Sequence, residues 1–283
     1  MEIEGLIDAL VGEIRQVEGV SAVVLGGSRA RGTHKEKSDI DLGIYYSPER
    51  ALDLETLNRV ASHFDDERRE QILTQPGGWG PWINGGGWLK VEGVPVDFLY
   101  RDLGKVRSVM AACLNGQVEI VYQAGHPLGF LSSMYMGEIA ICKPLWEAER
   151  QDVTALKAQT WPFPRALQKA LIDKFAWEIS FSLGTAHKAS QRKDVVYAAG
   201  SCFRSAACML QTLFAVNGQY WLNEKGAVAL VESFELRPRN FQARIESAFG
   251  ALAAESEAIE TAIDMLTGLA EETLRLSEVV GQV

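Results

Sequence analysis

The sequence predicts an α+β protein in which an N-terminal mixed sheet with flanking helices precedes a C-terminal helical bundle. Up to about residue 143, short runs of β-forming residues alternate with helical patterns, and beyond it almost only helical periodicity remains. The length of 283 residues suits one large domain or two modest ones, and the change in pattern favours two. We therefore expect domains at residues 1–143 and 144–283.

The first expected elements are a helix and two strands. Apolar residues recur at helical spacing over residues 3–17 and predict an amphipathic helix. The β-forming runs at residues 20–25 and 39–46 predict strands, the first of them buried. Ser47-Pro48-Glu49 combines a capping serine, a proline at the first helical position and an acidic residue, so we expect a helix from there to about residue 64.

A long loop and a hairpin follow. Residues 75–87 hold six glycines, two prolines and two tryptophans, a composition that predicts a loop. Residues 88–91 and 94–100 predict paired strands joined through Glu92-Gly93, and residues 117–123 predict a further strand. Helical periodicity then predicts three long helices, at residues 165–189, 194–216 and 251–279.

Composition narrows the function classes. The formal net charge of -9 disfavours a stable nucleic-acid partner, because an acidic surface repels phosphate, and it mildly favours a cationic acceptor. None of the four cysteines forms a C-x-x-C pair, which suits buried, reduced thiols and a cytoplasmic protein. The acidic N-terminus lacks the basic region of a signal peptide, and no apolar run reaches the ~18 residues of a membrane span. We expect no membrane partner, and the sequence leaves undecided whether the protein forms a homodimer.

Two closely spaced carboxylates are the first chemical signal. Asp39 and Asp41 lie two residues apart on a predicted strand, so their side chains point to the same face, with Cα atoms roughly 6–7 Å apart. Carboxylates held this close repel each other, which implies a bound cation. Hard oxygen ligands suit Mg²⁺, which takes one or two carboxylates plus substrate phosphates.

A glycine-rich turn precedes this pair. A predicted strand that runs into Gly26-Gly27-Ser28 and then a helix brings free backbone N–H groups to one point, which predicts an anion site. Gly27 allows close backbone approach, and Ser28 can donate its hydroxyl to a phosphate oxygen. Asp97 is a charged residue in an otherwise apolar predicted strand, and it is the candidate general base or further metal ligand.

These residues resemble the signature of the DNA polymerase β-like nucleotidyltransferase superfamily, in which G-S-x-A-x-G is followed by D-x-D and by a later lone aspartate on a strand. The segments here are GGSRARGTHKEKSDIDLGIYY and VPVDFLY. The helical second half resembles, in outline, that of the bacterial antibiotic (aminoglycoside and lincosamide) nucleotidyltransferases and related minimal nucleotidyltransferases. By this resemblance, Gly27 and Ser28 match the phosphate-binding turn, Asp39 and Asp41 match the metal ligands, and Asp97 matches the third carboxylate.

The resemblance implies in-line attack of an acceptor oxygen on the α-phosphorus of an NTP, with ATP favoured and pyrophosphate leaving. It implies two Mg²⁺ ions, one on Asp39 and Asp41 and a second shared among the three aspartates. Arg29, Lys188 and Lys193 are candidates for contacts with the triphosphate, and the alternative for each is a solvated charge.

The acceptor is not identified by the sequence. Transfer of AMP to a hydroxyl of a small molecule, such as an antibiotic, is the favoured function, because the acidic charge and a second domain that can supply a cleft support it. Protein adenylylation of toxin–antitoxin type and a non-catalytic nucleotide-binding regulator are the alternatives. The tryptophan- and glycine-rich loop 75–88 is expected either to cap a substrate or to serve as a hydrophobic lid.

Overall fold

The structure, a computed structural model, describes residues 2–47 and 49–281. The chain forms two compact units. The first, which we call the sheet unit, comprises the residues up to Ala111 together with Tyr135–Pro162. The second, the helical unit, comprises Ala112–Met134 and the residues from Phe163 onward. The contacts thus divide the chain differently from the composition shift near residue 143, because each unit includes residues from both sides of that point.

Five strands of the described residues form the sheet of the sheet unit, in the order β3-β4-β2-β1-β7. β2 and β4 are parallel, and every other neighbouring pair is antiparallel, so the expected mixed sheet is confirmed. The strands are β1 (Val20–Leu25), β2 (Ile40–Tyr46), β3 (Gly86–Val91), β4 (Val94–Asp102) and β7 (Lys143–Glu147). Sequence patterning missed β7, which is a short edge strand that contains Pro144 and is held through its pairing with β1.

The helix after β2 begins later than expected. Pro48 lies outside the described residues, and α3 runs from Leu54 to Phe64 because the side chain of Asp53 caps it, accepting a hydrogen bond of 3.0 Å from the Thr56 N–H. The predicted loop 75–87 contains a short helix and the start of β3. The other helices up to residue 158 are α1 (Ile3–Ile14), α2 (Gly27–Arg31), α4 (Gly80–Ile83), α5 (Leu103–Leu114), α6 (Ser133–Ile141) and α7 (Asp152–Ala158).

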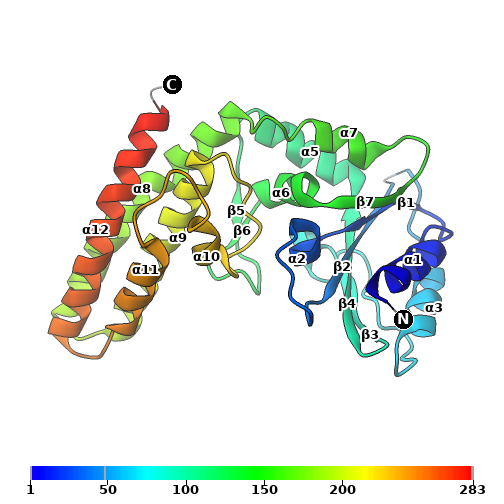
Figure 1. The fold of residues 1–283 in the computed structure, drawn as a ribbon, viewed down its shortest axis with the longest axis horizontal. Coiled ribbons are helices and arrows are strands. Elements are labelled where there is room, and N and C mark those ends of the chain that lie inside the picture. The colour runs from blue at the N-terminus through cyan, green and yellow to red at the C-terminus, as the bar shows by residue number, and fades with distance from the viewer. Residues whose placement is uncertain (1, 48, 282–283) are drawn as a thin grey trace. The chain divides into compact units, whose positions relative to one another are not determined.

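One face of the sheet is apolar and forms the core of the sheet unit. Alternate residues of the parallel pair point into it: Ile40, Leu42 and Ile44 from β2, and Val96, Phe98 and Tyr100 from β4, all fully buried. Buried residues of α1 and α3 pack against this face, and the two helices lie side by side (Figure 1). Because strand side chains alternate, the residues between these positions point to the opposite face.

The helical unit is built around two long helices, α8 (Arg165–Ser190) and α9 (Val195–Val216). They are antiparallel, because Gln168 donates a hydrogen bond to the Ala215 carbonyl, and Ser205 donates one to the Ile179 carbonyl. α12 packs on both helices, and α11 packs on α12, which confirms a helical C-terminal region. The remaining elements are β5 (Ile120–Val121), β6 (Phe130–Leu131), α10 (Ala227–Val231), α11 (Phe241–Gly250) and α12 (Ser256–Gly281).

Two expectations for this region are corrected. The strand expected over residues 117–123 has only two paired residues, those of β5. The last helix begins at Ser256, five residues later than expected, because turn residues precede it. None of the described helices has the length and apolar character that a membrane crossing requires.

Candidate functional site

Three aspartates meet at one end of the polar face of the sheet. Asp41 in β2 is the direct neighbour of Asp97 in β4 across the parallel pair, and Asp39 precedes β2 by one residue. Each of the three half-buried side chains offers a carboxylate oxygen, and these oxygens all lie within 4.8 Å of one another. Of the described residues, these three form the one group that can hold a metal ion in this way. The structure therefore brings together all three carboxylates that the sequence pointed to.

The glycine turn lies directly on Asp41. The Gly26 N–H donates a hydrogen bond of 2.8 Å to the Asp41 carbonyl. Gly27, the first residue of α2, has φ +57°, and a Cβ added there would lie 1.8 Å from Oδ2 of Asp41. Only glycine fits this position, because any side chain would collide with the carboxylate and would also have to adopt a left-handed conformation.

Ser28 carries a buried hydroxyl whose lack of a hydrogen-bond partner in the described part of the chain indicates a ligand-binding position. Its Oγ is inaccessible to solvent and has no hydrogen-bond partner among the residues that the structure describes. A buried hydroxyl without a partner is costly, so such groups are typically satisfied by water or by a bound molecule. Ser28 follows Gly27 in α2, beside the backbone N–H groups of the turn, where a phosphate oxygen would complete its hydrogen bonding.

Arg29 holds the loop that carries Asp39. Its side chain is largely buried, with 9% exposure. Nε donates a hydrogen bond of 2.8 Å to the Asp39 carbonyl, and Nη2 donates one of 2.6 Å to the Ser38 carbonyl. Sequence reasoning treated Arg29 as a candidate triphosphate ligand and did not predict these hydrogen bonds. Nothing in the local pattern shows that the guanidinium contacts backbone carbonyls nine and ten residues later in the chain. A direct contact with the triphosphate stays a prediction.

Lys188 and Lys193, the other candidates for the triphosphate, belong to the helical unit. Both are exposed, Lys188 in the last turn of α8 and Lys193 in the turn before α9. Lys193 has φ +57°, so it occupies a left-handed position in that turn. Their role in nucleotide binding stays a prediction.

The tryptophans of loop 75–88 have two different environments. Trp82 packs on Tyr135 with ring centroids 5.7 Å apart, and the Lys105 ammonium lies 4.3 Å from the Trp82 centroid, so Trp82 is part of the structure of the sheet unit. Trp79 stacks on Trp88 with centroids 4.5 Å apart and an interplanar angle of 23°. Trp88 nevertheless remains 62% exposed.

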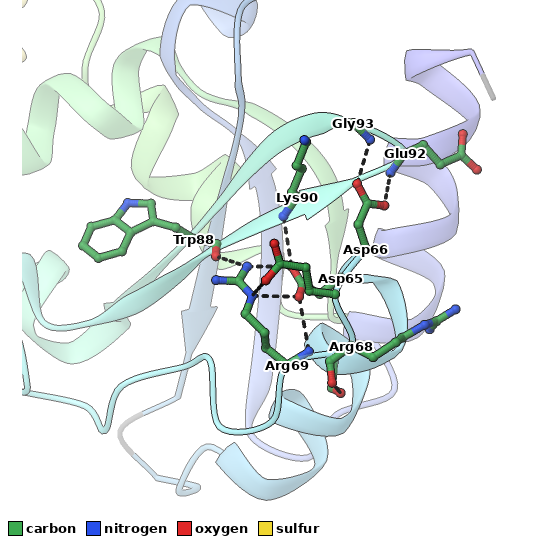
Figure 2. A network of polar contacts seen from close by, with 10 residues as sticks. Asp65, Asp66, Arg68, Arg69, Trp88, Lys90, Glu92 and Gly93 are labelled. Atoms are coloured by element: carbon green, nitrogen blue, oxygen red, sulfur yellow. Dashed lines mark hydrogen bonds and ion pairs between the residues drawn. The ribbon is translucent and has the colours of Figure 1, made fainter.

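A polar network fixes the hairpin that carries Trp88 (Figure 2). Arg69 donates hydrogen bonds of 2.9 Å and 2.7 Å to the two carboxylate oxygens of the fully buried Asp65, and one of 3.1 Å to the Trp88 carbonyl. These bonds from Arg69 hold the pKa of Asp65 well below its usual range. Asp66 accepts hydrogen bonds from the N–H groups of Glu92 and Gly93, at 2.8 Å and 2.9 Å, and so closes the β3–β4 turn.

A buried ion pair anchors the other end of the same sheet face. Arg101 donates hydrogen bonds of 2.7 Å and 2.6 Å to both oxygens of Glu138, and one of 2.7 Å to the Ile83 carbonyl. Burial is the largest single influence on the pKa of Arg101 and lowers it, but the charge of Glu138 and its hydrogen bonds, with smaller contributions from Tyr135 and Tyr45, together raise the pKa above its usual value.

Comparison with known proteins identifies a domain family in the part of the chain that carries the site. Residues 7–105, which include the glycine turn and all three aspartates, match the family model of the nucleotidyltransferase domain. The structure is also similar to that of a nucleotidyltransferase-like protein from Exiguobacterium sibiricum 255-15, with 11% sequence identity, a TM-score of 0.43, and coverage of 95% of this chain and 74% of that chain. No curated protein matches the chain.

The mixed sheet, the glycine turn and the converging carboxylates define a domain that transfers nucleotidyl groups. The matched region, residues 7–105, is a nucleotidyltransferase domain, and the protein is therefore a nucleotidyltransferase enzyme.

Proposed function

We propose that this protein transfers a nucleoside monophosphate, with AMP favoured, from a magnesium-bound NTP to a hydroxyl of a small-molecule acceptor such as an aminoglycoside or a lincosamide. The observation that carries the donor half is the convergence of Asp39, Asp41 and Asp97 within 4.8 Å, beside the Gly27-Ser28 turn. A phosphate-binding turn and a cation site are both needed to hold a nucleoside triphosphate.

The residues fit magnesium. Carboxylate oxygens are hard ligands, and Mg²⁺ completes its octahedron with substrate phosphates and water. Asp39 and Asp41 would hold the ion that binds the triphosphate, and Asp97 would share a second ion with them. When bound, the ions supply charge neutralisation at the phosphates and a lowered pKa for the acceptor hydroxyl.

The protein's own groups then have separate tasks. The backbone of Gly27 and the hydroxyl of Ser28 bind the phosphates that leave as pyrophosphate. Asp97 accepts the proton of the acceptor hydroxyl while the new bond from the acceptor oxygen to the α-phosphorus forms and the bond to pyrophosphate breaks. Arg29 keeps Asp39 in place through its hydrogen bonds to the backbone of the Asp39 loop.

Charge supports the choice of acceptor. A protein of net charge -9 attracts cationic small molecules and repels nucleic acid. We also propose that Lys188 and Lys193 are ligands of nucleotide phosphates.

We also propose a cytoplasmic location, which suits four free, buried thiols. Burial raises the pKa of each thiol, to about 11 for Cys113, Cys142 and Cys202 and to about 12 for Cys208, which keeps the thiols protonated and unreactive.

The test is pyrophosphate release from each of the four NTPs with Mg²⁺, across a panel of aminoglycosides and lincosamides. An Asp39→Asn/Asp41→Asn double variant serves as the control. Acceptor-dependent release that the double variant loses would support the proposal. If the wild-type protein leaves every compound of the panel unmodified while it still binds NTP with Mg²⁺, the proposed acceptor class is wrong.

A further inference from the structure

An exposed tryptophan lies beside the carboxylates. Trp88 in β3 is the direct cross-strand neighbour of Asp97 in β4, and neighbours in an antiparallel pair point to the same face of a sheet. The face opposite to Trp88 on its own strand is apolar, because Leu89 and Val91 are buried in the core. Trp88 therefore stands on the polar face, next to Asp97, with 62% of its surface exposed.

We propose that the stacked pair Trp79–Trp88 binds the acceptor, and that this acceptor presents an amino-substituted saturated ring to the Trp88 indole. The proposal rests on the transfer reaction proposed above, and it adds the residues that recognise the acceptor and the chemistry that they recognise.

The order of the strands places the pair on the acceptor side. Across the sheet, Trp88 in β3 is followed by Asp97 in β4 and Asp41 in β2, and then by the Gly27 turn, which continues from β1. The carboxylates thus lie between the phosphate turn and Trp88. In an in-line displacement the attacking oxygen enters opposite the leaving group. With pyrophosphate leaving at Gly27, the acceptor enters from the side of Trp88.

The pair is held in place before any ligand binds. The Trp79 ring packs against β3 at Gly86, where an added Cβ would lie 3.1 Å from a ring carbon of Trp79. The same Cβ would lie 1.8 Å from the Phe98 carbonyl oxygen. Arg69 fixes the Trp88 backbone, and Figure 2 shows the indole directed away from that network. A large apolar ring that is ordered yet exposed offers a binding surface at little further cost in conformational entropy.

The surroundings of Trp88 select the chemistry of its ligand. An indole face attracts cations through its quadrupole and packs against the C–H groups of a saturated ring. The neighbouring carboxylate of Asp97 and the net charge of -9 add to this attraction. Lys90, the next residue of β3 on the same face, is exposed and cationic. The amino group of the ligand therefore belongs on the Asp97 side of Trp88.

The experiment measures two affinities by titration calorimetry, with Mg²⁺ present throughout. The donor probe is a non-hydrolysable ATP analogue, α,β-methylene-ATP, and the acceptor probe is neomycin added to protein saturated with that analogue. Trp88→Ala and Trp88→Phe are compared with the wild type. Trp177→Ala is the matched control, because Trp177 is 61% exposed and packs on Phe181, but lies on α8 and not on the sheet.

We expect Trp88→Ala to weaken neomycin binding by about tenfold. Trp88→Phe should restore most of it, and the affinity for the analogue should stay unchanged in every variant. Loss of analogue affinity in Trp88→Ala with unchanged neomycin binding would overturn the proposal, because the pair would then bind the nucleobase of the donor. A wild-type protein that binds the analogue but not neomycin would also overturn it. The proposed function fails separately, if Asp39→Asn/Asp41→Asn binds the analogue as the wild type does.

Discussion

Gly27→Ala tests whether the glycine turn and the carboxylates form one site. A Cβ at this position would lie 1.8 Å from Oδ2 of Asp41 and 2.6 Å from its Cγ. Real Cβ contacts are essentially never shorter than 3.0 Å, so the carboxylate oxygen has to move by about 1.2 Å, the difference between 3.0 and 1.8 Å. A displacement of about 1 Å in a reacting group costs roughly 100-fold in rate, so we expect Gly27→Ala to lose activity on this scale.

A second effect has to be separated from this collision. Gly27 has φ +57°, and an alanine in the left-handed region costs about 1–2 kcal/mol of stability. Gly32, at the other end of α2, provides the control: its φ is +77°, and a Cβ added there meets nothing within 4 Å. Gly32→Ala therefore introduces the same backbone strain without the collision with Asp41.

Urea unfolding and calorimetry distinguish the two effects. Both variants should lose about 1–2 kcal/mol of unfolding free energy. Only Gly27→Ala should lose Mg²⁺-dependent binding of the ATP analogue and acceptor-dependent pyrophosphate release. Equal activity in the two variants would refute the reasoning, because it would mean that the turn does not constrain the Asp41 carboxylate.

Three further predictions concern side chains of the sheet unit. Ser28→Ala should weaken binding of the ATP analogue by about tenfold without lowering the melting temperature, since it removes a buried hydroxyl that has no partner among the described residues; a marked loss of stability would contradict this. Arg29→Lys should lower the turnover rate by about tenfold or more, because lysine lacks the planar guanidinium that donates from two separate nitrogens to the Asp39 loop, and a rate equal to that of the wild type would argue against a positioning role. The pKa of Asp65 is held well below its usual range, so its stabilising effect is complete above the unfolded-state pKa of about 4 and is lost as the pH falls toward the folded-state pKa. The difference in unfolding free energy between wild type and Asp65→Asn, measured in urea, should therefore be constant from pH 7 to about pH 5 and should shrink below about pH 4. A difference that grows as the pH falls would contradict a lowered pKa of Asp65 in the folded state.

The parts of the fold and site that sequence could predict are those encoded in local periodicity. The strand at residues 20–25 is present with these bounds, and the alternation of β2 places Asp41 opposite the buried Ile40 and Leu42. Asp97 was identifiable because a charge in an apolar strand violates that strand's pattern. Such signals survive because the two-residue repeat of a strand links each side chain to one face regardless of the rest of the chain.

The parts that could not be predicted depend on contacts between distant residues. β7 exists through its pairing with β1, more than 110 residues earlier in the chain, and its own sequence shows little alternation. The Arg69–Trp88 hydrogen bond and the Arg101–Glu138 pair likewise join residues 19 and 37 positions apart. The start of α3 was misplaced because the capping pattern at Ser47 indicates a helix start there, whereas the side chain of Asp53 caps the helix through its hydrogen bond from the Thr56 N–H.

In the proposed reaction, the residues for the donor and those for the acceptor come from separate segments of the chain and from separate strands of the sheet. The phosphate turn and two of the aspartates come from one short segment, residues 26–41, which β1, α2 and β2 hold together. The proposed acceptor-side pair comes from residues 79–88, a segment in which Gly86 lets Trp79 lie against the strand. Asp97 joins the two, because it neighbours Asp41 on one side and Trp88 on the other. Substitutions in residues 79–88 that preserve β3 can therefore change which acceptor binds while the nucleotide site stays intact, which is how one donor chemistry can serve different acceptors on the same fold.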